Sequence, residues 1–475
     1  MGRQVLAEEG ILPNLQALAK PDCYEVGLII GQTSGQRDYV IHLARTPRPA
    51  NKDETEDTQD ERKRPSDHVV IKSFKDLQEH WIAEHAKHVT RMLPGGFSVM
   101  GVFTVGPGDV FADSLGLKQL RQVLVRIKKH LSTNHFLFGD GCSVDKLLLH
   151  FDSKTHKHTC RLFSADSTTP SSGTSVDWKF QQAPARWHQI ECQYELDQFF
   201  PVTEAKLHNL SKKSLQEILQ TVEESVQASA CIIEGQAPDL SDGIEAVDWT
   251  GTGHKSKGKK EPLTLSAVLY QPCKLGTGDE EEMQLLPCGA SMEVYGTLAS
   301  RVFVNEKATV GDAVQALKED IIRSLAARLE LHWDSLIEEE QGSPEERVTL
   351  HEPPRRVLVP LPHCRVALSD YLFPGEGPSE ALVSLQELLD LDMSEDDVQK
   401  DLELQADPED FCPPEVERES TDVASSAPLS KNRGKASSSQ QHQQQTNVLL
   451  AGLIVAAVVL ILSVTAQLTG WFDRT

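Results

Sequence analysis

Residue types that bind zinc occur at alternate positions between His156 and Cys160. In a strand, His156, His158 and Cys160 would face the same side, and this geometry could hold a zinc ion. No fourth ligand follows at a short spacing, and the neighbouring Lys154 and Lys157 would repel a cation. The sequence leaves metal binding by these three residues open, but we predict no metal site and no cofactor.

Other motifs of catalytic chemistry are incomplete. Residues 253–259 match the GxxxxGK phosphate loop, but Lys260 stands where a Ser or Thr must contact magnesium, and no hydrophobic strand precedes the loop. His80, His85 and His88 lie in one predicted helix without the HExxH spacing of zinc proteases. We expect these three histidines to be exposed polar residues of that helix.

The nine cysteines are spread singly along the chain, without a CxxC pair, and their number is odd. This usage favours reduced thiols in the cytosol over a disulfide framework. Cys142, within FGDGCSVD, is predicted to lie on a loop where a nucleophile could stand. However, the residues that flank each cysteine match no recognisable motif of a catalytic cysteine. The GxSxG nucleophile elbow is absent as well. We predict no catalytic residues and therefore a protein that is not an enzyme.

Hydrophobic periodicity and strand-forming residue types predict the helices and strands that must position these residues. The first folded region is predicted to start at about Leu12. In the first region, the predicted strands are 24–31, 39–44, 69–73, 97–105, 146–152, 158–163, 178–181 and 188–194, and the predicted helices are 74–92, 112–131 and 211–230. In the second region, the predicted strands are 263–271, 291–305 with a break around 295–300, 356–361 and 365–372, and the predicted helices are 309–340 and 380–391. The predicted fold class is α+β, in two lobes.

Polar stretches mark the predicted domain boundaries. Residues 1–234 form the first lobe, with a disordered insertion at 47–67, and residues 262–390 form the second lobe. The intervening segment 235–261 has no hydrophobic period and is predicted to be a linker. Residues 391–446, which are acidic and then rich in Ser and Gln, are predicted to be a disordered tether.

The net charge of −24 is concentrated near the C-terminus. Residues 376–422 contain 17 acidic and two basic side chains, which gives −15. Nucleic acid is excluded as a partner on this ground, because phosphate contacts need clustered Lys and Arg. The acidic block could dock a basic partner surface, although such blocks are more often solvated spacers.

Residues 448–468 run for 21 residues without a charge and are predicted to form a single transmembrane helix. Lys431, Arg433 and Lys435 precede this segment, whereas only Asp473 and Arg474 follow it, so the charge bias keeps the bulk of the chain in the cytosol. The alternative, a buried soluble helix, needs a partner to cover an apolar surface on all sides. The sequence therefore predicts a tail-anchored membrane protein.

Two segments of the first lobe resemble the MPN domain, the α+β fold of zinc isopeptidases that remove ubiquitin-like modifiers. Residues 25–31 (EVGLIIG) resemble its E-x-x-G-x-x-x-G strand, and residues 101–107 (GVFTVGP) resemble its G-W-Y-H-x-H-P segment. The two zinc histidines are matched by Thr104 and Gly106, and the aspartate of its S-x-x-D element is matched by Leu117. Glu25 stands two residues before Gly27 instead of three, which turns it to the opposite face of a strand. The resemblance implies an MPN-like lobe without its metal.

Over nearly the whole length, the chain resembles the odorant response abnormal protein 4 family. The resemblance rests on EVGLIIGQ, VMGVFTVGP, residues 355–376 (RRVLVPLPHCRVALSDYLFPGE) and the C-terminal anchor. It implies a protein of the endoplasmic reticulum membrane that helps a subset of G-protein-coupled receptors to fold or to be transported. It also implies partnership with the protease of the ubiquitin-fold modifier.

Two functional hypotheses follow from the sequence. The first is a non-enzymatic, tail-anchored adaptor on the cytosolic face of the endoplasmic reticulum, which recruits that protease. The alternative is a degenerate metallo- or cysteine isopeptidase of the MPN type, motivated by the MPN-like strands, the His156–His158–Cys160 row and Cys142.

Overall fold

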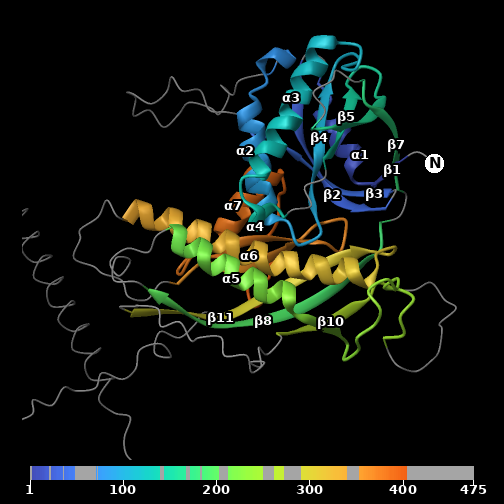
Figure 1. Cartoon of the computed structure of the whole chain (residues 1–475). Coiled ribbons are helices and arrows are strands. Elements are labelled where there is room, and N and C mark those ends of the chain that lie inside the picture. Colours follow the sequence, from blue (N-terminus) through green and yellow to red (C-terminus); the bar gives the residue numbers. More distant parts are fainter. Residues whose placement is uncertain are drawn as a thin grey trace, which may run out of the picture. The chain divides into compact units, whose positions relative to one another are not determined.

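The computed structural model describes most of the chain up to residue 403 (Figure 1). The described residues are 3–20, 23–35, 37–48, 71, 73–139, 144–166, 172–181, 184–202, 212–249, 261–271, 290–339 and 352–403. All of them belong to the first of two compact units, Met1–Asp407. Of the predicted tether at 391–446, residues 391–403 are described and include the buried Val398 and Glu403. Residues 404–446 and the predicted anchor at 448–468 lie outside the described residues.

Among the described residues, seven strands form a closed barrel. Their order around the barrel is β1 (Gln4–Ala7), β3 (Arg37–Arg45), β2 (Glu25–Ser34), β4 (Ser98–Gly106), β5 (Asp145–Asp152), β6 (His158–Ser164) and β7 (Thr174–Phe180). β1 pairs in parallel with both β3 and β7 and thereby closes the barrel. The parallel pairing of β4 with β5 places Thr104 opposite His150.

Strands β2 and β4 are buried along almost their whole length, because both of their faces are covered. The inner face contributes Phe103 and Val105 to a core that also includes Ile11 and Leu15 of helix α1 (Ile11–Leu18). The outer face is covered by α2 (Glu79–Met92) and α3 (Ser114–Leu131), which follow the 3-10 turn η2 (Phe74–Asp76). Coverage on both sides explains why these strands are apolar runs instead of alternating sequences.

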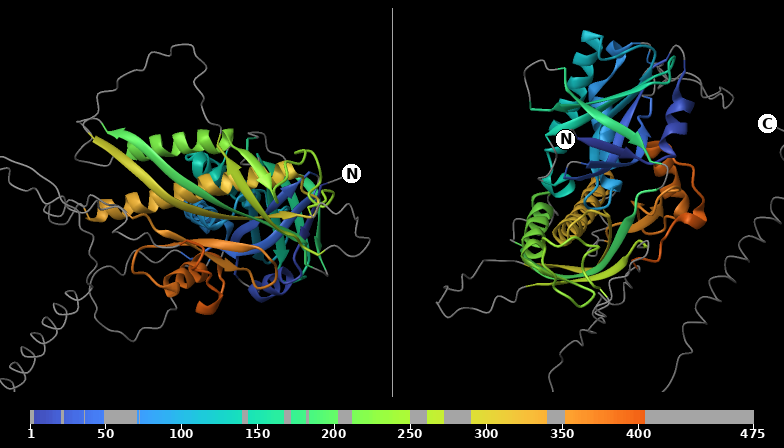
Figure 2. Two further views of the ribbon diagram at one scale, coloured as in Figure 1. Left: turned by 90° about the horizontal axis from the view of Figure 1, so that it is seen from below. Right: turned by 90° about the vertical axis from the view of Figure 1, so that its right-hand side faces the viewer.

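A second, open sheet contains four described strands. Their order is β11 (Ala290–Asn305), β8 (Trp187–Val202), β10 (Thr264–Tyr270) and β9 (Ala230–Ile233). β8 and β11 pair antiparallel over all 16 residues, from Trp187 opposite Asn305 to Val202 opposite Ala290. Helices α5 (Lys212–Ala228) and α6 (Val310–Glu339) lie along the face of this sheet that is turned toward the barrel (Figure 2).

A third group of elements lies beside the barrel and the second sheet. It consists of the hairpin of β12 (Arg355–Pro360) and β13 (Ala367–Leu372), helix α7 (Pro378–Leu389) and the 3-10 turn η4 (Glu395–Asp397). The short α4 (His135–Phe138), which follows α3, packs against α6. Arg323 of α6 donates to the carbonyl oxygens of Leu137, Leu93, Pro94 and Phe97 at 3.0 to 3.2 Å and so ties α6 to the turns of the barrel half.

The α+β class is confirmed, and most predicted elements are present with shifted ends. The folded region begins at β1, before the predicted start at Leu12. The helix predicted at 74–92 is interrupted, because η2 ends at Asp76 and α2 begins only at Glu79. The strand predicted at 69–73 is not supported by Ile71 and Ser73, its two described residues, since neither lies in a strand.

The predicted break around 295–300 is wrong, because β11 is continuous through this region. Gly296 has a φ of 146°, a conformation that costs glycine little, so the chain passes through it without leaving the pairing with β8.

The predicted linker at 235–261 does not coincide with a boundary between the two sheets. β8 and β9 precede this segment and β10 and β11 follow it, yet the four strands form one sheet. Residues 235–249 are described and are anchored in the fold: Ile244 is fully buried, and its N–H donates to the carbonyl of Ala308 at 3.0 Å. The hydrophobic residues here are too few to give a period, which is why the sequence pattern indicated a linker.

Within the described residues, no helix combines the length and the apolar character needed to cross a bilayer.

Candidate functional site

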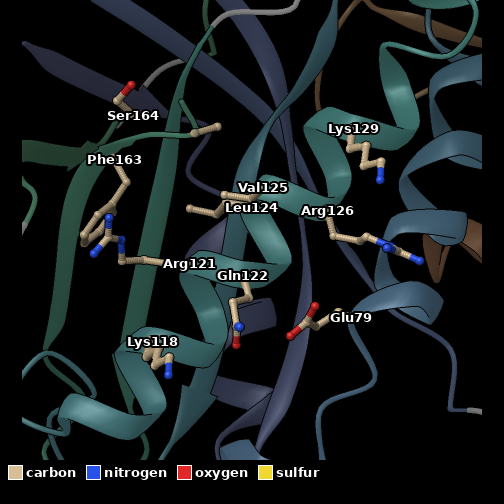
Figure 3. A pocket seen from close by; sticks show the side chains of 11 residues that line it. Glu79, Lys118, Arg121, Gln122, Leu124, Val125, Arg126, Lys129, Phe163 and Ser164 are labelled. Carbon is tan, nitrogen blue, oxygen red and sulfur yellow. The ribbon is translucent and has the colours of Figure 1, made fainter. Parts of the chain in front are cut away.

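A groove of about 630 Å³ runs along α3 (Figure 3). Its lining residues come from the start of α2, from α3 and from the end of β6 and the residue after it. They are Glu79, Lys118, Arg121, Gln122, Leu124, Val125, Arg126, Lys129, Phe163, Ser164 and Ala165. The groove is therefore a feature of the barrel's outer layer.

The amphipathic pattern of α3 explains why cations line the groove. One face of the helix is buried and consists mainly of Leu120, Val123, Leu124, Ile127 and Leu131. The remaining positions carry the Lys and Arg side chains, which stay in contact with solvent. Asp113 caps the helix, since its carboxylate accepts a hydrogen bond from the N–H of Leu115 at 3.0 Å.

The groove is electropositive on a chain whose net charge is −24. Four cationic side chains line it, against the single carboxylate of Glu79. The guanidinium of Arg121 lies 6.0 Å from the ring centroid of Phe163, and Figure 3 shows the two side chains directed toward one another. Val125 adds exposed apolar surface. Such a lining suits an anionic ligand, above all a peptide with several carboxylates.

A second cluster of polar side chains joins α2 to α3. The Oε1 atom of Glu84 lies 3.1 Å from Nδ1 of His130 and 3.9 Å from Nε2 of His80. The two imidazole rings stand edge to face, with centroids 5.2 Å apart. These three ligand atoms lie within 4.8 Å of one another, and the cluster could hold a metal ion.

The segment that resembles the zinc-binding part of MPN proteins has a different arrangement. Thr104, which is fully buried, has its Oγ1 3.0 Å from Nδ1 of His150, and Nε2 of His150 lies 2.6 Å from the carbonyl oxygen of Gly108. Since a carbonyl only accepts, Nε2 carries the proton and Nδ1 accepts from the threonine hydroxyl. Burial lowers the pKa of His150. Both ring nitrogens are therefore occupied within the protein.

The residues of the predicted zinc row are only partly brought together. His158 and Cys160 lie in β6, but His156 precedes the strand in a turn with a φ of 55° and is exposed. Cys160 faces the barrel interior, while Nε2 of His158 lies 3.4 Å from the carbonyl of Trp178. The expectation that all three face one side of a strand is wrong for His156. Cys142 and residues 253–260 lie outside the described residues.

The expectation that His85 is an exposed residue of its helix is also wrong. Its side chain is buried, with Nε2 2.7 Å from the carbonyl of Leu388 and Nδ1 3.1 Å from Oγ1 of Thr46. Burial lowers the pKa of His85 to about 4. His80 and His88 are exposed, as predicted.

The sequence pattern did not single out the groove or the cluster around Glu84. The signal for the groove was the alternation of apolar and basic residues along α3, which predicts a helix but not what faces its polar side. The cluster joins positions 80 and 84 to position 130, and no local spacing connects residues so far apart.

A closed barrel, an open sheet and a cation-lined groove together define an α+β protein with a surface suited to an anionic partner. A family model described as odorant response abnormal 4-like matches residues 27–400, and the chain belongs to this family.

Proteins of the family from vertebrates are similar over most of the chain. A Xenopus tropicalis protein odr-4 homolog is 28% identical over 405 residues, which cover 84% of this chain and 86% of the relative. A human protein odr-4 homolog is 30% identical over 404 residues, which cover 82% and 84%. Among solved structures, UfSP from C. elegans gives a TM-score of 0.39 at 10% identity, covering 83% of this chain and 57% of that chain. A likeness this low supports no assignment.

Proposed function

We propose that this protein is a non-enzymatic, tail-anchored adaptor of the endoplasmic reticulum membrane. In this role it aids the folding or transport of a subset of G-protein-coupled receptors and recruits the protease of the ubiquitin-fold modifier. Membership of the odorant response abnormal 4-like family supports a role in odorant responses, to which the family's name refers. The first part of the chain would act as an MPN-like scaffold without its metal.

The observation that carries the adaptor role is the chemistry of the groove on α3. Its lining side chains include four cations and an exposed valine but neither a histidine nor a cysteine. Cations in a shallow apolar setting bind carboxylates well, whereas proton transfer near neutral pH is the work of groups that titrate there. The groove is thus better suited to holding an acidic segment of a partner than to chemistry.

The arrangement around Thr104 supports the same proposal. A zinc isopeptidase needs histidine ligands with a free ring nitrogen, but Thr104 and Gly106 stand at the matching positions. The nearby His150 has both of its ring nitrogens engaged. These residues stabilise the packing of the barrel instead of offering ligands.

Anchoring would keep the adaptor and its bound partner close to membrane substrates. A partner held by the folded part would be confined near the membrane, and confinement raises its effective concentration toward membrane substrates, by up to the millimolar range for short flexible linkers. The uncharged segment at 448–468 is the proposed anchor.

Cell fractionation of the full chain tests anchoring and recruitment together. Deleting residues 448–475 should move both this protein and the protease of the ubiquitin-fold modifier from the membrane fraction to the soluble fraction. A protease that stays on the membrane after the deletion would contradict recruitment by this chain.

Charge reversal in the groove tests the binding surface separately. The double variant K118E/K129E should reduce co-purification of the protease at least about tenfold, because like charges then face each other across the interface. The double variant K154E/K157E, which makes the same charge change in the exposed turn after β5, is the matched control. Equal loss in both variants would show that net charge, and not the groove, governs binding.

A further inference from the structure

We propose that His80, Glu84 and His130 bind a zinc ion that joins α2 to α3. Nothing in the sequence pattern or in the family's name assigns such a site. The three residues come from two helices, with His80 and Glu84 one turn apart on α2 and His130 in the last turn of α3. An ion held here would fix the spacing of the two helices that cover the barrel.

The distances between the ligand atoms fit a tetrahedral ion. With bonds of about 2.0 to 2.1 Å, the ligand atoms of a tetrahedral zinc site are separated by about 3.4 Å. The measured separations from Oε1 of Glu84, 3.1 Å and 3.9 Å, lie on either side of this value. Changes of about half an ångström in side-chain positions are enough to reach it.

The donor set also matches the preferences of zinc. Two imidazoles and one carboxylate are a known three-ligand combination, in which a water completes the tetrahedron. The side chain of His80 is 65% exposed and that of Glu84 is 34% exposed, so the ion can enter from solvent and the side chains can adjust. His130 is less exposed, at 18%, and would be the more rigid ligand.

The charges around the cluster are mixed. The guanidinium of Arg126 acts on His130, and its positive charge opposes a divalent cation. The carboxylate of Glu84 lies within contact distance of both histidines and offsets this repulsion at the ion's position.

Zinc titration of the full-length, detergent-solubilised chain tests the site. After removal of metal by a chelator, ZnCl₂ is added in competition with a chromophoric chelator, and the melting temperature is measured in parallel. We expect one zinc ion of high affinity per chain and a higher melting temperature with zinc. Cobalt(II) in place of zinc should give the intense visible bands of a tetrahedral site.

Three ligand variants and one matched control test which residues bind the zinc ion. H80N, E84Q and H130N should each weaken zinc binding by more than about 10-fold, because even loss of a supporting residue around a metal costs 10- to 100-fold. H156N, which changes an exposed histidine in the turn before β6, should bind zinc as the unchanged chain does. H80N alters an exposed side chain and should fold normally, as circular dichroism of the metal-free protein will establish.

Two results would overturn the proposal. One is a titration in which the chain does not bind one zinc ion per chain. The other is zinc binding that survives in the double variant H80N/H130N, which would place the ion elsewhere, for example on cysteines. Neither result would bear on the adaptor function, which depends on the groove and the anchor.

Discussion

Arg356 holds Asp320 through two parallel hydrogen bonds, from Nη1 to Oδ2 at 2.6 Å and from Nη2 to Oδ1 at 2.9 Å, with both side chains at most 3% exposed. The same carboxylate accepts from the N–H of Gly95 at 2.8 Å and from the hydroxyl of Ser300 at 2.7 Å. One buried aspartate of α6 thus joins the turn before β4, the edge strand β11 and the hairpin strand β12. These contacts hold the pKa of Asp320 below its ordinary value against the effect of burial.

Replacing Asp320 by Asn should destabilise the protein by about 3–5 kcal/mol, because it leaves the Arg356 guanidinium buried without its counter-charge. Urea unfolding of the full chain measures the change. The control is D390N, which removes the exposed partner of Arg45; there we expect a change within about 0.5 kcal/mol. Similar losses in the two variants would contradict a special role for the buried pair.

Acid should destabilise the fold through His85. Its pKa is about 4 in the folded protein and near the ordinary 6.5 in the unfolded chain, so the unfolded state binds more protons between these values. The free energy of unfolding should therefore decline as the pH falls from about 6.5 toward 4, by on the order of 3 kcal/mol.

The variant that isolates this effect is H85Q, which has no titrating side chain. Its stability should depend less steeply on pH than that of the unchanged chain, as measured by urea unfolding at several pH values. The decline should not vanish, because His42, 2.7 Å from the carbonyl of Leu389, also has a pKa lowered by burial. H156N should keep the full pH dependence, and an identical slope in H85Q would refute the assignment.

Alanine at Gly101 should prevent normal packing of the barrel. A Cβ atom there would lie 2.0 Å from the carbonyl oxygen of Leu147, a backbone atom of the neighbouring strand that cannot move without breaking the sheet. We expect a loss of more than about 3 kcal/mol or failure to fold, measured by urea unfolding. G243A is the control, since an added Cβ there would come no closer to a residue beyond its chain neighbours than 4.0 Å, the distance to the Cβ of Ala246, and this variant should remain stable.

Cys160 should resist thiol reagents in the native protein. It is 2% exposed among the barrel's interior side chains, and burial raises the pKa of its thiol. Iodoacetamide followed by peptide mass spectrometry should label the partly exposed Cys23 and leave Cys160 unmodified until the protein is unfolded. Equal labelling of the two native thiols would mean that the barrel opens readily.

Local sequence patterns predicted most elements, because an apolar run or a helical period lies within one segment. They were sufficient for β4 and α3, whose predicted bounds differ from the structure by a few residues at most. β1 and β9 have four residues each, too few to show a period, and they escaped prediction.

Local sequence patterns do not indicate which strands pair with one another in a sheet. Nothing in the sequence of β8 indicates that it pairs with β11, about a hundred residues later, instead of continuing the barrel that precedes it. The same limit applies to the candidate sites. His156, His158 and Cys160 form a local pattern because they are close in sequence, whereas His80 and Glu84 are too far from His130 in the sequence to form one.

The pairing of β8 with β11 also has a consequence for folding during synthesis. During synthesis, all strands of the barrel are present once residue 180 has left the ribosome, but β8 has no antiparallel neighbour until residues 290–305 follow. In that interval Tyr194 and Leu196, which are buried in the finished protein, lack the residues of β11 that lie opposite them and the cover of α6. The nascent chain therefore carries an open strand edge for about a hundred residues of elongation, and a fragment that stops before β11 would retain that edge permanently.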